Sequence, residues 1–285
     1  MSFEFSIEFD LFSAEPDVMV YEGTIWNDWI YGSIDDDDIY GYAGDDDLDG
    51  GLGDDFIDGG AGNDLLFGDW GSDILIGGAG DDRIVASIGS DEYYGGTEHD
   101  SSNAWDEIDT VYYSNAFSPV HIEVASAENN LIYVDAYSAA GGHMTHVLQD
   151  IERIEFDAFT LAYDLDGNAG DAVRLIGAVY GAAEIDNLAT VGYYLDYLDT
   201  GYSFEAVMGY ALDDVGAYSN EDVVDLLYFN LAGCLPSFDV QDQFVDLLED
   251  GLFSQEELAV FAADLQLNAL NIDLAGLAYS GIEYV

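Results

Sequence analysis

An aspartate recurs at every ninth residue between positions 28 and 91, and this spacing is the strongest chemical feature of the chain. From Gly23 the sequence divides into GTIWNDWIY, GSIDDDDIY, GYAGDDDLD, GGLGDDFID, GGAGNDLLF, GDWGSDILI, GGAGDDRIV and ASIGSDEYY. The sixth residues of these copies are Asp28, Asp37, Asp46, Asp55, Asp64, Asp73, Asp82 and Asp91. A regular series of carboxylates could hold divalent cations such as Ca²⁺, which takes about six to eight oxygen ligands from carboxylates and backbone carbonyls.

The fourth residue of most copies is a glycine, and this residue type suits the same chemistry. Glycine adopts positive φ without strain and lets backbone carbonyls approach an ion closely. The fourth-position glycines are Gly44, Gly53, Gly62, Gly71, Gly80 and Gly89. We predict that they and the eight aspartates form the calcium sites. Trp26 and Asp35 replace glycine in the first two copies, so those sites are expected to be altered or empty.

The eighth residue of every copy is large and mostly aliphatic, which indicates the element that positions the aspartates. A short strand around it would turn this side chain inward, and two copies would make one turn of a flattened parallel roll. Alternate copies would then stack. One interior row is predicted to hold Ile30, Leu48, Leu66 and Ile84, and the other Ile39, Ile57, Leu75 and Tyr93. Four stacked loops at each edge enclose three gaps, which predicts about six calcium ions.

Three of the copies follow the pattern GGxGxDxUx in full, where U is a large apolar residue. This pattern resembles the RTX family of calcium-binding repeats, whose members are secreted by bacterial type I systems. The resemblance covers about a quarter of the chain. It implies a parallel β-roll, folding triggered by calcium outside the cell, and an uncleaved C-terminal export signal. A ninth copy, GGTEHDSSN from Gly95, lacks the apolar position and is interpreted as the decaying end of the array.

Strand-like segments flank the repeats on both sides. Residues 1–12 alternate between apolar and polar, which predicts a strand that either caps the roll or is donated to a neighbouring molecule. Between 105 and 163, the runs 108–113, 120–125, 131–137 and 146–156 would extend the roll or form a small antiparallel sheet. The segment DIERIEFDAFTLAYDLDGNAG resembles one that often closes RTX repeat regions.

From Asp171 onward the apolar residues follow a helical period. Ser203, Ser219 and Ser254 are expected to begin helices, and Gly201 and Gly251 to end them. DAVRLIGAVYG aligns with DVVDLLYFNLA, and YLDYLDTGYSFEAVMGYALD with FVDLLEDGLFSQEELAVFAAD. These pairs predict a duplicated helical domain of roughly six helices.

This half resembles a helical domain of unknown function found at the C-terminal ends of RTX-type and surface-layer-associated proteins. The resemblance implies a secreted or surface context and no known catalysis. The Arg-Pro-Asp turns usual in that family read AAEIDN and CLPSFD here, so their arginine is missing. The closing GIEYV resembles the ends of such proteins and suggests the export signal.

The predicted fold is therefore mixed: a parallel β-roll with flanking strands, followed by an all-helical C-terminal domain. Residues 1–22 form the N-terminal strand segment, 23–104 the calcium-binding roll, 105–163 its β extension, and 164–285 the duplicated helical domain with the secretion signal.

Three other features are interpreted as structural. His143 and His146 lie three apart in a predicted strand and lack a third ligand, which argues against a transition-metal site. Asp164, Asp166 and Asn168 have EF-hand spacing, but Ala169 and Leu175 occupy the positions that need Gly and Glu. That segment is expected to be an Asx-rich turn before a helix. The single cysteine, Cys234, is expected to pack as a small buried side chain.

The charge balance restricts the partners. The chain has 285 residues with 60 acids, three arginines and no lysine, for a net charge of −57. Nucleic acids and anionic membranes need positive charge, so neither is expected as a partner. No run is apolar enough for membrane insertion, and residues 1–5 lack the basic segment of a standard cleavable signal peptide, so export without one is expected. About six Ca²⁺ ions bring only about twelve positive charges. The remaining acidity fits a saline medium or a surface that binds cations loosely.

No catalytic motif of the HExxH, GxSxG or nucleotide-loop type occurs, and about 22 residues precede the repeats, so an enzyme is not expected. Two functions remain. One is a building block of an extracellular filament, surface layer or matrix, assembled as a homo-oligomer. The other is a soluble adhesin that binds a glycan or cell surface, for which 21 tyrosines and four tryptophans could supply stacking.

Overall fold

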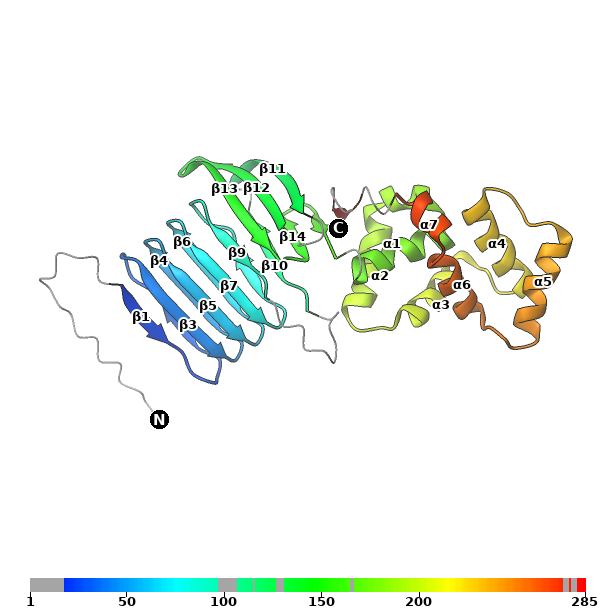
Figure 1. Ribbon diagram of the computed structural model, residues 1–285, viewed down its shortest axis with the longest axis horizontal. Coiled ribbons are helices and arrows are strands. Elements are labelled where there is room, and N and C mark those ends of the chain that lie inside the picture. Colours follow the sequence, from blue (N-terminus) through cyan, green and yellow to red (C-terminus); the bar gives the residue numbers. More distant parts are fainter. Residues whose placement is uncertain are drawn as a thin grey trace, which may run out of the picture.

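The computed structural model describes residues 18–96, 107–114, 116–126, 131–164, 167–273, 277 and 281–285. The strand predicted over residues 1–12 lies outside these residues. The described chain forms an elongated molecule with a β-solenoid at one end and a helical domain at the other (Figure 1). The predicted mixed fold, a roll followed by helices, is confirmed.

Two parallel sheets form the solenoid, and successive strands alternate between them. The first sheet contains β1 (Met19–Glu22), β3 (Asp37–Ala43), β5 (Phe56–Ala61), β7 (Ile74–Ala79) and β9 (Glu92–Tyr94). The second contains β2 (Trp29–Tyr31), β4 (Asp47–Leu52), β6 (Leu65–Trp70) and β8 (Arg83–Val85). Paired residues lie 18 positions apart, so two copies make one turn. The solenoid begins at β1, four residues before the first repeat.

The eighth residue of each copy builds the interior, as predicted. One row pairs Ile30, Leu48, Leu66 and Ile84 in register, and the other pairs Ile39, Ile57, Leu75 and Tyr93. All of these side chains are fully buried except Ile30, which is half-buried in the first turn. Each buried aliphatic side chain contributes about 1.5–3 kcal/mol, so the rows supply most of the apolar stabilisation of the roll.

The segment after the repeats both extends the roll and forms an antiparallel sheet, so the two predicted arrangements coexist. Its strands are β10 (Thr110–Tyr113), β11 (Phe117–Ser126), β12 (Leu131–Ser138), β13 (Gly142–Gln149), β14 (Arg153–Phe156) and β15 (Thr160–Ala162). β13 adds parallel to β9, and β10 and β14 add parallel beyond β8, whereas β11, β12 and β13 run antiparallel. The sequence predicts one strand over 146–156, but the structure has two, the end of β13 and β14. The chain crosses from one sheet to the other around Asp150, where φ is 54°.

The described residues of the helical domain form seven α-helices, compared with the roughly six predicted. They are α1 (Asn168–Val179), α2 (Leu188–Asp199), α3 (Phe204–Val215), α4 (Asn220–Ala232), α5 (Phe238–Glu249), α6 (Gln255–Ala263) and α7 (Gln266–Asn271), with a 3₁₀ helix, η2 (Ala182–Asp186), after α1. The predicted caps Ser203, Ser219 and Ser254 each accept a backbone N–H in the first turn. Gly201 and Gly251 follow the ends of α2 and α5 with φ of 86° and 67°.

The two aligned sequence copies occupy corresponding elements. α1, α2 and α3 belong to the first copy, and α4, α5 and α6 to the second. In each copy the first helix packs against the other two, and α1 also packs against α4. α1 is central, with nine buried residues, whereas α4 buries three and lies towards the outer end of the molecule (Figure 1).

A buried arginine joins the roll to the helices. Arg153, at the start of β14, forms ion pairs with Asp164 and with Asp199 of α2, the latter at 3.2 Å between Nη2 and Oδ1. Its Nη1 also donates to the Glu152 carbonyl oxygen at 3.1 Å. The C-terminal strand β16 (Ile282–Tyr284) pairs antiparallel with β15 and contacts α2. The roll and the helical domain therefore share one continuous interface.

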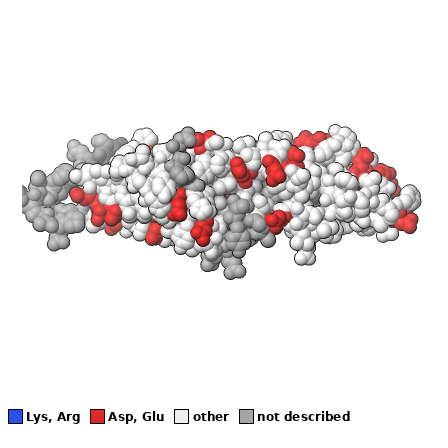
Figure 2. Space-filling model, turned by 90° about the horizontal axis from the view of Figure 1, so that it is seen from above, with Lys and Arg blue, Asp and Glu red and all other residues white. Residues whose placement is uncertain are grey.

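Acidic side chains lie along the face seen in Figure 2, where no Lys or Arg is visible. All three arginines are in ion pairs, since Arg83 binds Glu155 at 2.5 Å and Arg174 binds Asp171. Cys234 is exposed, so its predicted burial is wrong; it lies in the turn after α4, outside the core. Within the described part of the chain, no helix is long and apolar enough to cross a bilayer.

Candidate metal centre

The repeat aspartates form two columns along the edges of the solenoid. From Asp37 to Asp91 they are at most 2 % exposed. In each column the backbone N–H of one aspartate donates to Oδ1 of the aspartate 18 residues later, at 2.7–3.0 Å. One column contains Asp28, Asp46, Asp64 and Asp82, and the other Asp37, Asp55, Asp73 and Asp91. The columns therefore bring together the residues that the sequence analysis predicted as ligands.

Six of these carboxylates keep one oxygen that is buried and has no hydrogen-bond partner. This oxygen is Oδ1 of Asp37 and Oδ2 of Asp46, Asp55, Asp64, Asp73 and Asp82. Burial of an unpaired carboxylate is costly, so the neutral form is favoured. Burial, with a smaller effect of neighbouring carboxylates, raises the pKa of Asp55 and Asp64 to about 6 and that of Asp73 and Asp82 to about 8. The hydrogen bonds from backbone N–H groups only partly oppose this shift.

Each unpaired Oδ2 lies beside the first glycine of its own copy, and in the column of Asp46, Asp64 and Asp82 a carbonyl from the next turn also lies there. A methyl group built on Gly41 would lie 2.4 Å from Asp46 Oδ2 and 2.4 Å from the Gly59 carbonyl oxygen. The same arrangement occurs at Gly59 and Gly77. No side chain fits there, but a small hard cation bound by oxygens does, which satisfies the chemistry expected of Ca²⁺.

The fourth-position glycines bring further carbonyls into the stack. Gly44, Gly53, Gly62, Gly71 and Gly80 have φ between 116° and 154°, a region that favours glycine. Gly89 does not have positive φ, but a methyl group on it would lie 1.4 Å from the Gly71 carbonyl oxygen. Successive loops therefore approach so closely that only glycine is accommodated.

The ligand set must be largely backbone. Among the described residues, no three His, Cys, Asp or Glu side chains converge on one point. Each ion would take few carboxylates and complete its shell with carbonyls. The two histidines lie on opposite faces of β13: His143 is exposed, and His146 is fully buried with Nδ1 2.7 Å from the Tyr113 hydroxyl. Their side chains therefore do not meet.

Asp28 and Asp91 differ from the other predicted carboxylate ligands, and Asp37 differs in that its engaged oxygen is Oδ2 while its Oδ1 is buried and unpaired. Oδ2 of Asp28 accepts hydrogen bonds from the N–H and hydroxyl of Thr24, at 2.6 and 2.8 Å. Oδ2 of Asp37 accepts the Ser33 N–H at 2.6 Å. At the other end, Oδ2 of Asp91 accepts from the hydroxyls of Ser87 and Tyr93 at 3.0 and 2.8 Å. These carboxylate oxygens are engaged by protein donors at the two ends of the array.

Two residues that the sequence analysis missed continue one column. Oδ1 of Asp109 accepts the Asp82 N–H at 3.0 Å, and the Asp109 N–H donates to Glu152 Oε2 at 3.0 Å. Burial raises the pKa of both carboxyl groups to about 8. A methyl group on Gly95 would lie 2.3 Å from Asp109 Oδ2, which is the same relation as between Gly77 and Asp82.

The ninth copy is therefore interrupted, and its interpretation as a decaying end is wrong. The copy starts at Gly95, and the aspartate that takes the sixth position is Asp109. This aspartate follows its first glycine by fourteen residues, whereas in the other copies the distance is five. Val111, two residues further on, supplies the inward apolar position and pairs with Ile84. The D-x-U pattern of Asp109–Val111 was a usable signal, but the insertion removed the nine-residue spacing that identified the other copies.

The fold and the carboxylate columns define a parallel β-solenoid of calcium-binding repeats. Residues 23–57, 40–75 and 67–101 match the family described as RTX calcium-binding nonapeptide repeat (4 copies). These residues are RTX repeats, and calcium binding is implied by them. A search of curated proteins finds no match.

One solved structure similar to the chain is the AlgE6R3 subunit of the mannuronan C5-epimerase from Azotobacter vinelandii. The two sequences are 23 % identical, and the match covers 48 % of this chain and 81 % of the other, with a TM-score of 0.18. This similarity is too weak to bear on the function of the chain.

Substitution of one column aspartate tests the predicted ligands. Asp64→Asn keeps an oxygen that can accept the Asp46 N–H but removes the charge that an ion needs. We expect the calcium concentration at the folding midpoint, followed by circular dichroism, to rise on the order of tenfold. The matched control is Asp28→Asn, because Thr24 already engages that carboxylate. Equal shifts for the two variants would contradict the assignment.

The raised pKa values predict an unusual pH dependence without calcium. Carboxyls with a folded-state pKa near 6 or 8 hold protons at pH values where the unfolded chain, with an aspartate pKa of 3.8, has lost them. Stability in calcium-free buffer is therefore greatest below about pH 4 and falls as pH rises to about 8. With saturating calcium the ionised form is bound, so stability should rise over the same window. Thermal melts at fixed ionic strength check both directions, and a calcium-free stability that rises with pH would refute the prediction.

Proposed function

We propose that this protein is a secreted, calcium-dependent structural component that assembles into an extracellular filament, surface layer or matrix. The observation that supports assembly best is the open first turn of the solenoid. β1 and β2 are the outermost strands of the two sheets, and within the described residues nothing pairs with their outer edges. Exposed strand edges offer backbone donors and acceptors to another chain.

Calcium would drive folding after export in this proposal. Burial and mutual repulsion oppose ionisation of Asp64 and its equivalents until cations bind, because the groups lie buried in one column. Low calcium would then keep the chain unfolded, and extracellular calcium would fold it. Export by a type I system, suggested by the RTX repeats, fits this order of events. Catalysis forms no part of the proposal, because the buried carboxylates are engaged in holding the loops together.

Electron microscopy during a calcium titration tests self-assembly. We expect monomers in chelator and ordered filaments or sheets at ~1 mM calcium, a typical concentration for extracellular sites. Magnesium at the same concentration and ionic strength is the control, because it suits carbonyl-rich sites poorly. Folded but only monomeric protein at millimolar calcium, across a range of protein concentrations, would contradict the structural role.

A tyrosine cluster on α2 and α3 supports a second candidate, a glycan- or cell-surface-binding module. The Tyr197 ring packs against those of Tyr193, Tyr202 and Tyr210, with centroids 5.2–5.5 Å apart. The latter three side chains are nearly half exposed, and such aromatic faces can stack on sugar rings.

Glycan arrays test this candidate. The double substitution Tyr202→Ala and Tyr210→Ala should remove at least ~10-fold of any glycan affinity, since it removes two stacking faces. Tyr218→Ala is the control, because that side chain is exposed outside the cluster. Silence of the wild-type protein on the array, or an equal loss in the control, would eliminate the candidate.

A further inference from the structure

One buried aspartate of the roll lies outside the repeats. Asp109 is 6 % exposed and lies beyond residues 67–101, the last segment that matches the repeat family. Its Oδ1 accepts the Asp82 N–H at 3.0 Å, whereas no hydrogen bond of the described chain ends on its Oδ2. A buried carboxylate oxygen without a donor is costly, so the ionised group needs a cation at Oδ2.

Two oxygens converge beside Gly95 at distances that suit a calcium ion. A methyl group built on Gly95 would lie 2.3 Å from Asp109 Oδ2 and 1.9 Å from the Asp150 carbonyl oxygen. Within the repeats, a methyl group on Gly77 would lie 2.3 Å from Asp82 Oδ2 and 2.6 Å from the Gly95 carbonyl oxygen. Oxygen ligands of Ca²⁺ lie about 2.3–2.6 Å from the ion, and carbonyls or water can complete the shell. The space beside Gly95 therefore has the form of a repeat site.

Strand register, and not the nonapeptide period, brings the Asp150 carbonyl to this point. β13 pairs parallel with β9, with Gln149 beside Tyr94, so Asp150 follows beside Gly95. The Gly95 N–H donates to the Gln149 carbonyl oxygen at 3.0 Å, which fixes the approach of the two segments. The two ligands thus come from parts of the chain that β11 and β12 separate.

The same turn is connected directly to the helical domain, and its strands β10 and β14 lie at the end of the roll nearest the helices (Figure 1). Glu152 Oε2 accepts the Asp109 N–H, and the Asp109 carbonyl oxygen accepts the Arg153 N–H, both at 3.0 Å. The Arg153 guanidinium pairs with Asp164 and with Asp199 of α2. An ion that fixes Asp109 therefore also fixes the backbone from which this guanidinium extends.

Both carboxylate partners of Arg153 are themselves tied to helices. Asp164 Oδ2 accepts the Ala169 N–H in the first turn of α1 at 3.0 Å, and Asp199 Oδ1 accepts a hydrogen bond from Asn168 Nδ2 at 3.0 Å. Displacement of Arg153 would leave both carboxylates without their cation, which is strongly destabilising for partly buried groups. Order in the last turn of the roll and docking of α1 and α2 should therefore form together.

We propose that Asp109 and the Asp150 carbonyl hold a further calcium ion outside the repeats, and that this ion controls the docking of the helical domain onto the roll. The inference rests on the calcium-driven folding proposed above and adds a second step to it. Ions in the repeats fold the roll, and the ion at Asp109 then attaches the helices through Glu152 and Arg153. Because such coupling is reciprocal, docking strengthens the binding of this ion by the same factor.

Matched substitutions in the full-length chain test the site. Asp109→Asn keeps an oxygen for the Asp82 N–H but removes the charge that the ion needs. Glu107→Gln is the control, because it removes the same charge from an exposed side chain two residues away. Arg153→Met keeps the proposed ligands but cuts the connection to α2. Asp199→Asn is the milder variant of that connection, should the buried arginine be required for folding.

Two readouts separate the ion from the docking. Equilibrium dialysis counts bound calcium, and hydrogen exchange with mass spectrometry follows β4–β7 separately from α2 and β16. At saturating calcium, Asp109→Asn should bind one ion fewer than the wild type and exchange about tenfold faster in α2 and β16, with β4–β7 unchanged. Arg153→Met and Asp199→Asn should keep the full ion count, bind one ion about tenfold more weakly and show the same faster exchange. Glu107→Gln should match the wild type.

Four results would overturn the inference, each in a different way. If Asp109→Asn binds as many ions as the wild type, the site is wrong while the repeat sites stand. If it loses one ion but α2 and β16 stay protected, the ion does not control docking. Equal effects of Glu107→Gln would mean that charge alone, and not ligation, is responsible. A wild-type roll whose protection is independent of calcium would remove the calcium-driven folding of the proposed function together with the inference.

Discussion

Stacked carboxylates buried at the edges of the solenoid are the constraint on which the rest of this structure depends. From Asp46 onward each aspartate uses one oxygen to accept a backbone N–H from the preceding turn, as Asp64 does for Asp46 at 2.8 Å. In Asp46, Asp55, Asp64, Asp73 and Asp82 the other oxygen is buried and unpaired. A column of such groups is unfavourable without cations, because burial and mutual repulsion both oppose ionisation. The same geometry fixes the turn-to-turn register, which aligns the two interior rows of aliphatic residues.

The carboxylate column also reaches the helical domain through adjacent residues. Glu152 ends the column by accepting the Asp109 N–H, and Arg153 next to it binds Asp164 and Asp199. A buried arginine is stable only while its carboxylate partners stay in place. Order in the last turn of the roll is therefore linked through two neighbouring residues to the packing of α2 and β16. Arg153 is one of only three basic residues, Lys and Arg together, in a chain with a net charge of −57.

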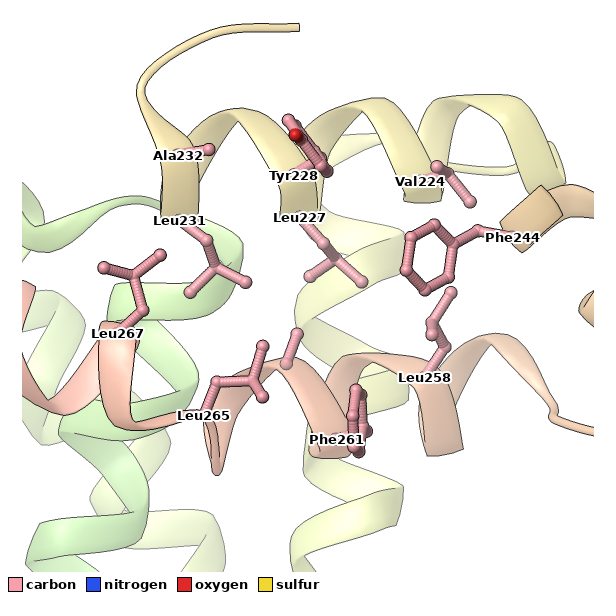
Figure 3. A pocket seen from close by; sticks show the side chains of 11 residues that line it. Val224, Leu227, Tyr228, Leu231, Ala232, Phe244, Leu258, Phe261, Leu265 and Leu267 are labelled. Atoms are coloured by element: carbon pink, nitrogen blue, oxygen red, sulfur yellow. The ribbon is translucent and has the colours of Figure 1, made fainter. Parts of the chain in front are cut away.

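The helical duplication shows how two copies of one motif diverge when their surroundings differ. α1 lies between neighbours and is almost entirely buried, while α4 lies at the outer end. In the first copy the Tyr194 hydroxyl donates a hydrogen bond to Asp214. In the second copy apolar side chains of α4, α5 and α6 line a groove instead (Figure 3). The exposed surface of the first copy is rich in tyrosine. That of the second is rich in leucine and phenylalanine.

The sequence alone determined the roll, its two interior rows and the aspartate columns, because a strict nine-residue period leaves one regular arrangement for the side chains. It also determined the helix boundaries at Ser203, Ser219 and Ser254, where a local hydrogen bond selects the residue. The tertiary structure alone decided that Asp109 and Glu152 extend a column, since an insertion breaks their spacing and only strand pairing brings them together. It likewise decided that Asp28 and Asp91 are engaged by protein donors, because the residues that surround a carboxylate at the end of an array are set by packing and not by period.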